Sequence, residues 1–397
     1  MRSYLHVLAI PRVGRLLAAA TLTYLSTAML GITVAVGVAQ SRGSLAEAGL
    51  VLTAHALSVA ACAPIAGRLA DWLGARRAVI TYLPLHASAY VLLGWTLAGS
   101  GSLVIVAAAL AGATAPPTAA VVRSHLPVVI PTDRLNTGYA LISVTNSATF
   151  VAGPPLAGLL SAVASPTFAL AICGAARLAG DLAVAATRNL ATGKRGAPKG
   201  LAGRGIGPLA DRQVRILLII IAADTFGYGS LDMVAVSFGK ETSHTAGLLL
   251  GALSAGEVVG GLIYGSRNRS TSLRTQLVAL HLLTVVVLAA AGAIAAVPLI
   301  GLFYLAAGTV SGARDALGQL ILSESAPPAY RTETFAWLNT FMWAGFALGT
   351  TVSGQLLDRT GVTTTLLVAA GVAVLAAGGA SVLRTRTPAK ESATRGG

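Results

Sequence analysis

Two acidic residues lie deep within long apolar runs of this chain, where a charged group is costly. Asp224 lies about ten residues into the run 214–238, and Glu257 lies about twelve residues into the run 245–265. At about 1.5 Å per residue of α-helix, either position is near the middle of a lipid bilayer. An ionisable side chain at that depth predicts a functional site, and a buried carboxylate is a candidate for reversible proton binding.

Other polar residues in the apolar runs complete a candidate substrate cavity. Arg314 and Asp315 are neighbours in one run, so their side chains point about 100° apart and must face different partners. Arg314 is predicted to face the cavity or to form a salt bridge with Asp224. Tyr24 and Tyr228 add hydroxyl groups that suit a cavity wall, although hydroxyl groups in helices can also bond to the backbone.

One charged pair and one histidine have a structural interpretation. Arg177 and Asp181 are four residues apart, so they share a helix face and are predicted to form an ion pair with each other. His55 is predicted to be a hydrogen-bonding group between helices, although imidazole is also a side chain that titrates near neutral pH.

The composition of the chain is that of a membrane protein. Of its 397 residues, 55% are hydrophobic and only 11% are charged, whereas soluble domains carry about 25% charged residues. A spanning helix needs about 20 mostly apolar residues. Twelve runs reach that length, namely 14–39, 45–69, 78–98, 102–123, 136–162, 166–187, 214–238, 245–265, 273–296, 298–322, 332–356 and 361–383. The runs are continuous rather than alternating, which predicts an all-α membrane protein with twelve transmembrane helices.

Basic residues are concentrated on one side of this predicted topology. With both termini in the cytoplasm, the inner segments hold 23 of the 28 lysine and arginine residues. This asymmetry indicates a multi-pass protein of the cytoplasmic (inner) membrane in that orientation. The net charge of +14 then lies against the anionic inner leaflet, so the lipid bilayer is the expected partner and nucleic acid is not.

The longest polar stretch divides the spans into two sets of six. Residues 188–213 are rich in Gly, Pro and basic residues, which is typical of a cytoplasmic linker. The linker separates the region 1–187 from the region 214–383, and a cytoplasmic tail, 384–397, follows. Two six-helix bundles joined in this way indicate an internal duplication with pseudo-symmetric halves.

A charged stretch, GRLADWLGARR, connects the second and third runs. Gly67 allows two helices to cross closely, and Gly74 lies before the third run. Asp71 can dock at the start of another helix, where the backbone carries partial positive charge. Arg76 and Arg77 can hold neighbouring acids or lipid phosphates. These residues predict a latch that stabilises one conformation and must break in the other.

This stretch resembles the loop signature G-x-L-A-D-x-x-G-R-R of the major facilitator superfamily. The resemblance implies that the second helix packs against the eleventh, which begins near Arg331. It also implies that spans one, four, seven and ten line a central cavity, so that Asp224 faces the substrate. A degenerate copy of the stretch, residues 261–267, follows the eighth run and lacks the Asp.

A second resemblance lies in the fifth run. Gly153, Pro154 and Gly158 resemble the G-P-x-x-G motif of the superfamily's drug–proton exporters, without the glycine repeats that precede it in the full pattern. Proline bends a helix because it lacks a backbone N–H, and glycine permits close packing against a partner. The double proline at 116–117 predicts a deformed fourth helix.

These features predict a secondary active transporter and not an enzyme. The sequence has no G-x-x-x-x-G-K-S/T phosphate-binding loop, so an ion gradient is the expected energy source. It has no catalytic constellation, and neither a cofactor nor a metal site is expected. The favoured function is proton-coupled efflux of a small amphipathic molecule by a monomer that uses alternating access. The alternative is proton-coupled uptake of a small polar solute such as a sugar or a carboxylate.

Overall fold

A computed structural model describes residues 2–42, 45–97, 99, 102–187, 207–239, 243–266, 272–294 and 297–384. Every regular element within these ranges is a helix. Residues 188–206 of the predicted linker and residues 385–397 of the predicted tail lie outside the described residues.

The first half of the chain forms one helical bundle. Its elements are α1 (Arg2–Leu8), α2 (Pro11–Arg42), α3 (Leu45–Leu73), α4 (Ala75–Leu97), α5 (Leu103–Ala113), α6 (Thr118–Val129), the 3-10 turn η1 (Thr132–Arg134), α7 (Leu135–Val163) and α8 (Pro166–Ala186). The second half forms another bundle. Its elements are η3 (Gly207–Ala210), α9 (Arg212–Gly239), α10 (Ser243–Ser266), α11 (Leu273–Ile294), α12 (Val297–Ser325), η4 (Pro328–Tyr330) and α13 (Arg331–Ser381).

Three of the predicted runs are broken or joined in the structure. The run 102–123 is broken into α5 and α6 around Pro116 and Pro117, because proline has no N–H to continue the helical hydrogen bonds. The last two runs are joined in α13, which turns at Gly361 with a φ of 83°. Glycine adopts this left-handed conformation without the steric cost that a side chain adds.

Helices are present for all twelve predicted spans. By length and hydropathy, nine helical segments of the described ranges can cross a membrane, with α5 and α6 taken together and α13 taken as one. The helices α7 and α12 complete the set with 29 residues each, or about 43 Å of helix. The second arm of α13, after Gly361, is the twelfth span.

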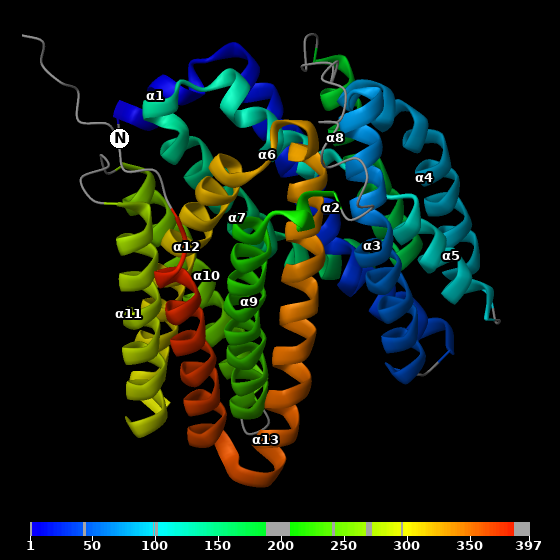
Figure 1. Ribbon diagram of the computed structural model, residues 1–397. Helices are drawn as coiled ribbons and strands as arrows, with labels where there is room; N and C mark the ends of the chain where they lie inside the picture. Colours follow the sequence, from blue (N-terminus) through cyan, green and yellow to red (C-terminus); the bar gives the residue numbers. More distant parts are fainter. Residues whose placement is uncertain are drawn as a thin grey trace, which may run out of the picture.

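One hydrophobic core joins the two halves, and separate cores fill them elsewhere. The shared core combines Leu16 and Val121 of the first half with Leu217, Leu317 and Phe335 of the second. The remaining clusters each contain residues of one half alone. Figure 1 shows that the two bundles meet near the top of the view and diverge toward the bottom. The molecule is therefore closed between its halves at one end only.

Close packing inside the second half depends on glycines. A Cβ at Gly260 would lie 1.9 Å from the carbonyl oxygen of Thr309, and one at Gly256 would lie 2.2 Å from that of Leu305. No side chain fits at such distances, so α10 and α12 are in backbone contact. Small residues have this role in membrane helices, where packing rather than hydrophobicity drives association.

Replacing Gly260 with valine is expected to lower the free energy of unfolding by about 1 to 3 kcal/mol, because overpacking forces the two helices apart. The measurement is the thermal unfolding of detergent-purified protein. Gly251→Val on the same helix is the matched control, since a Cβ there has no neighbour within 4 Å. An equal loss of stability in both variants would contradict the packing argument.

Candidate transport site and interhelical latch

The carboxylate of Asp71 joins the two halves of the molecule. Asp71 is in the last turn of α3, and its two oxygens accept hydrogen bonds from the backbone N–H groups of Thr332 (3.0 Å) and Glu333 (2.8 Å). These N–H groups are at the first turn of α13, where they have no partner within the helix. The contact predicted between Asp71 and the start of the eleventh helix is therefore present, and its action as a latch stays a prediction.

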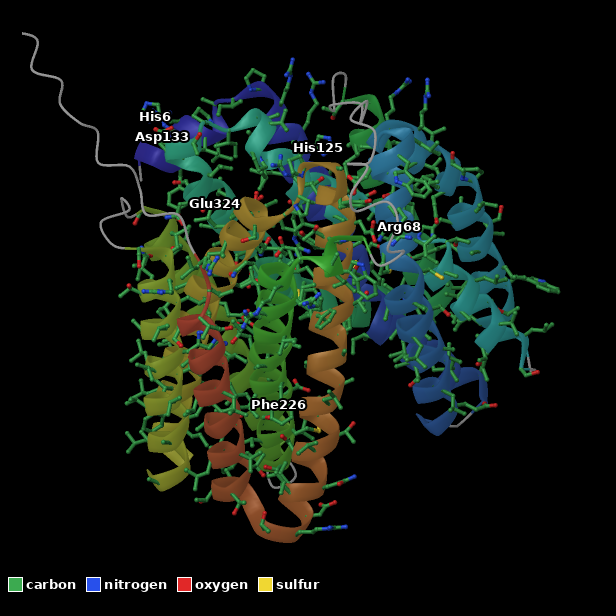
Figure 2. All side chains as sticks on the ribbon, viewed as in Figure 1. His6, Arg68, His125, Asp133, Phe226 and Glu324 are labelled. Atoms are coloured by element: carbon green, nitrogen blue, oxygen red, sulfur yellow. The ribbon has the colours of Figure 1, made fainter. Side chains whose placement is uncertain are left out.

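A charged pair strengthens the same contact. The guanidinium of Arg68 binds both carboxylate oxygens of Glu333, at 3.0 Å and 2.7 Å, in the two-pronged geometry that suits arginine. Gly67 allows this approach, because a Cβ there would lie 2.7 Å from the Cβ of Ala336. Arg68 lies in the upper part of Figure 2 with His125, whereas Phe226 lies well below. Glu333 is not among the residues predicted from the sequence, although it lies two residues after Arg331.

The other predicted latch residues shape the turn that follows. Gly74 has a φ of 88° and separates α3 from α4, a helix-ending role that favours glycine. Arg76 donates from Nε to the carbonyl oxygen of Ala185 near the end of α8, at 3.0 Å. Arg77 is exposed. The turn is thus fixed to the first half, and α3 presents Asp71 to the second.

The degenerate copy of the motif makes the pseudo-symmetric contact with different chemistry. The side chains of Asn136 and Thr137, at the start of α7, donate to the carbonyl oxygens of Tyr264 (2.9 Å) and Gly265 (2.6 Å). These carbonyls are at the end of α10, where they have no partner within the helix. Spans two and eleven are therefore joined by the carboxylate of Asp71, which accepts hydrogen bonds from backbone N–H groups. Spans five and eight are joined by side chains that donate hydrogen bonds to backbone carbonyl groups.

Glu257 lies on α10 between the two halves. Its carboxylate is near the hydroxyl of Ser311 on α12, at 3.4 Å, and it also interacts with Ser147 on α7 of the first half. No ion pair involving Glu257 exists among the described parts of the chain. Tyr228 on α9 is close enough to interact electrostatically with it. The predicted site residues Glu257 and Tyr228 are therefore brought together.

Asp224 has partners inside the second half. Its Oδ1 lies 3.0 Å from Nε of Arg314 on α12 and 2.9 Å from Nε2 of His281 on α11. The salt bridge to Arg314 is the alternative that the sequence left open. His281 was missed, because a single histidine in an apolar run shows nothing of its neighbours. Arg314 is buried among these helices instead of lining an exposed wall.

Tyr24 is buried beside a cation. The guanidinium of Arg123 on α6 lies over the Tyr24 ring, 5.5 Å from its centre, which is a favourable cation–π geometry. Asp315, on the opposite half, interacts electrostatically with Tyr24 and accepts a hydrogen bond from Gln319 at 2.8 Å. Tyr24 thus lies where the two halves meet, and the structure adds Arg123 to the predicted set.

The predicted pair of Arg177 and Asp181 is present at 3.3 Å and supports the broken fourth span. Arg177 also donates to the carbonyl oxygen of Pro116 at 2.6 Å, and Asp181 accepts from the hydroxyl of Thr118. Both side chains therefore form hydrogen bonds with residues at the gap between α5 and α6. This is a structural role.

The proline motif of the fifth span is only partly a packing site. A Cβ at Gly153 would lie 2.6 Å from that of Ala28, so α7 and α2 approach closely there. Gly158 has no neighbour within 4 Å of such a Cβ, so the close packing expected there is wrong. The helix α7 continues through Pro154 from Leu135 to Val163, and a bend at Pro154 stays a prediction. Within the described ranges, no cluster of His, Cys, Asp and Glu suits a metal ion.

A comparison with protein families identifies the class of protein. The model of the Major Facilitator Superfamily matches residues 16–240 and again 216–397. The chain therefore belongs to this superfamily of membrane transporters, and it is not an enzyme. The two matches overlap over residues 216–240, within and just after α9.

Individual proteins that resemble this chain share only a small fraction of its residues. The multidrug efflux pump Tap of Mycobacterium tuberculosis is 27% identical over 364 residues, which cover 84% of both chains, and that of Mycobacterium bovis has the same values. The human organic anion transporter TETRAN has a similar fold, with a TM-score of 0.76, 16% identity and coverage of 94% and 99%. The transporter FucP, in the outward conformation, has a TM-score of 0.74, 17% identity and coverage of 97% and 100%.

Asp71→Ala is expected to shift the molecule toward a state that is open at the latch end. Loss of a capping acid costs about 1 kcal/mol, which is about a fivefold change in the ratio of the two states. The separation of spin labels at the exposed positions Thr81→Cys and Thr275→Cys, in a chain with Cys62→Ser and Cys173→Ser, measures this shift. A longer distance component should appear.

Asp358→Ala is the matched control for this experiment. Asp358 is exposed and lies close to the turn of α13 at Gly361, at the opposite end of the molecule. If Asp71→Ala and Asp358→Ala give the same distance distribution, Asp71 does not act as a latch.

Proposed function

We propose that this protein is a proton-coupled exporter, which exchanges protons for a small amphipathic molecule by alternating access. The observation that carries the proposal is the position of Glu257, an acid near the middle of a span that contacts hydroxyl groups of both halves. Such a residue is costly in a membrane and is expected to have a function. It can take up a proton or attract a substrate, and the two then compete.

The arrangement of the halves supports alternating access. The concentration of basic residues on the latch side favours a cytoplasmic location for that end, with both termini inside the cell. The halves then face outward in this structure, with the Asp71 and Glu333 contacts closing the inner end. A proton on Glu257 removes the negative charge that holds Ser147 and Ser311, and this weakens the contact between the halves.

The relatives support export more than uptake. The curated relative that aligns with most of the chain is named a multidrug efflux pump. The fold alone leaves the direction open, because FucP is a fucose:proton symporter. We propose that the protein acts as a monomer in the inner membrane, with lipid, protons and its substrate as partners.

Wild-type protein in an exporter-deficient bacterial strain is expected to lower the accumulation of some compounds in a broad panel of amphipathic dyes and antibiotics. Glu257→Gln is expected to reduce energised efflux at least tenfold, since the amide cannot exchange a proton. The measurement is dye retention with and without a protonophore.

Asp358→Asn is the matched control, because it makes the same chemical change at an exposed position near the turn at Gly361. Unchanged accumulation across the whole panel would contradict export. Growth on a sugar or carboxylate as sole carbon source, dependent on the wild-type protein, would favour uptake instead.

A further inference from the structure

His281 is a buried histidine whose two ring nitrogens both face oxygen atoms. Its side chain has no exposed surface. Nδ1 lies 2.7 Å from the carbonyl oxygen of Leu277, one turn earlier on α11, and Nε2 lies 2.9 Å from Oδ1 of Asp224 on α9. A carbonyl oxygen can only accept a hydrogen bond, so Nδ1 must carry a hydrogen.

Arg314 determines the charge of Asp224 in this group. Its Nε donates to the same Oδ1 at 3.0 Å, while one terminal nitrogen donates to the hydroxyl of Thr284 at 2.5 Å. Arginine is always charged and favours the ionised carboxylate. An ionised Asp224 only accepts, so Nε2 of His281 must also carry a hydrogen. Two acceptors facing the two ring nitrogens suit hydrogens on both, which is the arrangement of an imidazolium ion.

We propose that His281 and Asp224 form a proton-binding site, in which the stored proton lies on Nε2 of His281 and faces the Asp224 carboxylate. This inference rests on the proposed function, because it assigns the place of a transported proton. Imidazole suits such a role, since histidine normally gains and loses a proton between about pH 5 and 8.

Loss of this proton has a structural consequence. A neutral His281 keeps the hydrogen on Nδ1 that Leu277 accepts, so a lone pair on Nε2 then points at the negative Oδ1. The link from α11 to α9 is lost, while the link from α12 through Arg314 remains. Proton release therefore frees α9 on one side, and α9 is the seventh span, which lines the cavity in this superfamily.

Asp224 provides the route for the proton. His281 has no exposed surface, whereas 18% of the Asp224 side chain is exposed. A proton from water binds the carboxylate of Asp224 and passes from Oδ1 to Nε2 along the 2.9 Å hydrogen bond. Release follows the same path in reverse. Asp224 is thus the relay, and His281 is the store.

Few other charged groups face this site. Arg314 and Asp315 come from α12, and Glu257, on α10, interacts electrostatically with Arg314. Residues 362–381 of α13, which packs against α11, contain no titratable side chain. The proton on His281 is therefore influenced mainly by the charges of Asp224 and Arg314.

His86 on α4 is the natural control, because it is a buried histidine without a carboxylate. Its Nδ1 lies 3.4 Å from the hydroxyl of Thr114, and its ring packs against Tyr90. Its buried Nε2 has no hydrogen-bond partner among the described residues, so nothing there favours a hydrogen on both ring nitrogens.

The test is nitrogen NMR of the full-length protein with isotope-labelled histidine, in lipid, between pH 5 and 8. The wild type should show one buried imidazolium at pH 7, and His281→Gln should remove it. Asp224→Asn should convert it to a neutral ring, since the asparagine amide can donate to Nε2. His86→Gln should leave it unchanged.

Two results would overturn the inference. One is a neutral His281 throughout this pH range in the wild type, and the other is an imidazolium that persists in Asp224→Asn. The comparison of wild type with Asp224→Asn decides the question even if His281→Gln does not fold. A neutral His281 in a protein with proton-dependent efflux removes the inference alone, and an imidazolium in a protein without efflux removes the proposed function alone.

Discussion

A lipid bilayer offers no water to solvate a charge or an unpaired peptide group, and the polar contacts of this protein follow from that constraint. Asp71 lies where another helix, α13, presents the free N–H groups of its first turn. Arg177 lies where the break between α5 and α6 leaves the carbonyl of Pro116 without a helical partner. These two charges thus lie at a helix end and at a helix break, where unpaired backbone groups are available.

The same constraint explains why the two halves meet at one end. The shared hydrophobic core and the Asp71, Glu333 and Asn136 contacts all join helix ends, where backbone groups are free to bond between halves. Deeper in the membrane the halves also meet through side chains, at Glu257 and Ser147. A joint built from helix ends can break and form again without unfolding a helix, which is what alternating access requires.

Inside the membrane, the acids divide into two kinds. Asp224 has two cationic or potentially cationic partners in its own half, so its charge is balanced locally. Glu257 contacts hydroxyl groups on both sides of the junction between the halves. The group around Asp224 can hold a proton without a movement of the halves. The charge of Glu257, in contrast, affects the contact between the halves. In the proposed cycle both sites bind a proton, and the one at Glu257 acts on the contact between the halves.

The apolar runs alone predict the twelve spans, and the polar stretch between them predicts two sets of six. That Asp71 meets the eleventh helix followed from the resemblance to the superfamily. Whether a run of residues spans the membrane, and how costly a charge within it is, depend on the free energy of transferring each side chain from water to lipid. That free energy is a property of the residue itself and needs no knowledge of distant segments. The sequence placed Asp224 and Glu257 at mid-membrane for the same reason. The folded molecule shows further that Asp224 bonds to His281, that Glu333 binds Arg68, and that Gly158 has no close neighbour, which no local pattern predicts. Those facts depend on which helix lies beside which and on how each is rotated about its axis, and packing between distant segments sets both.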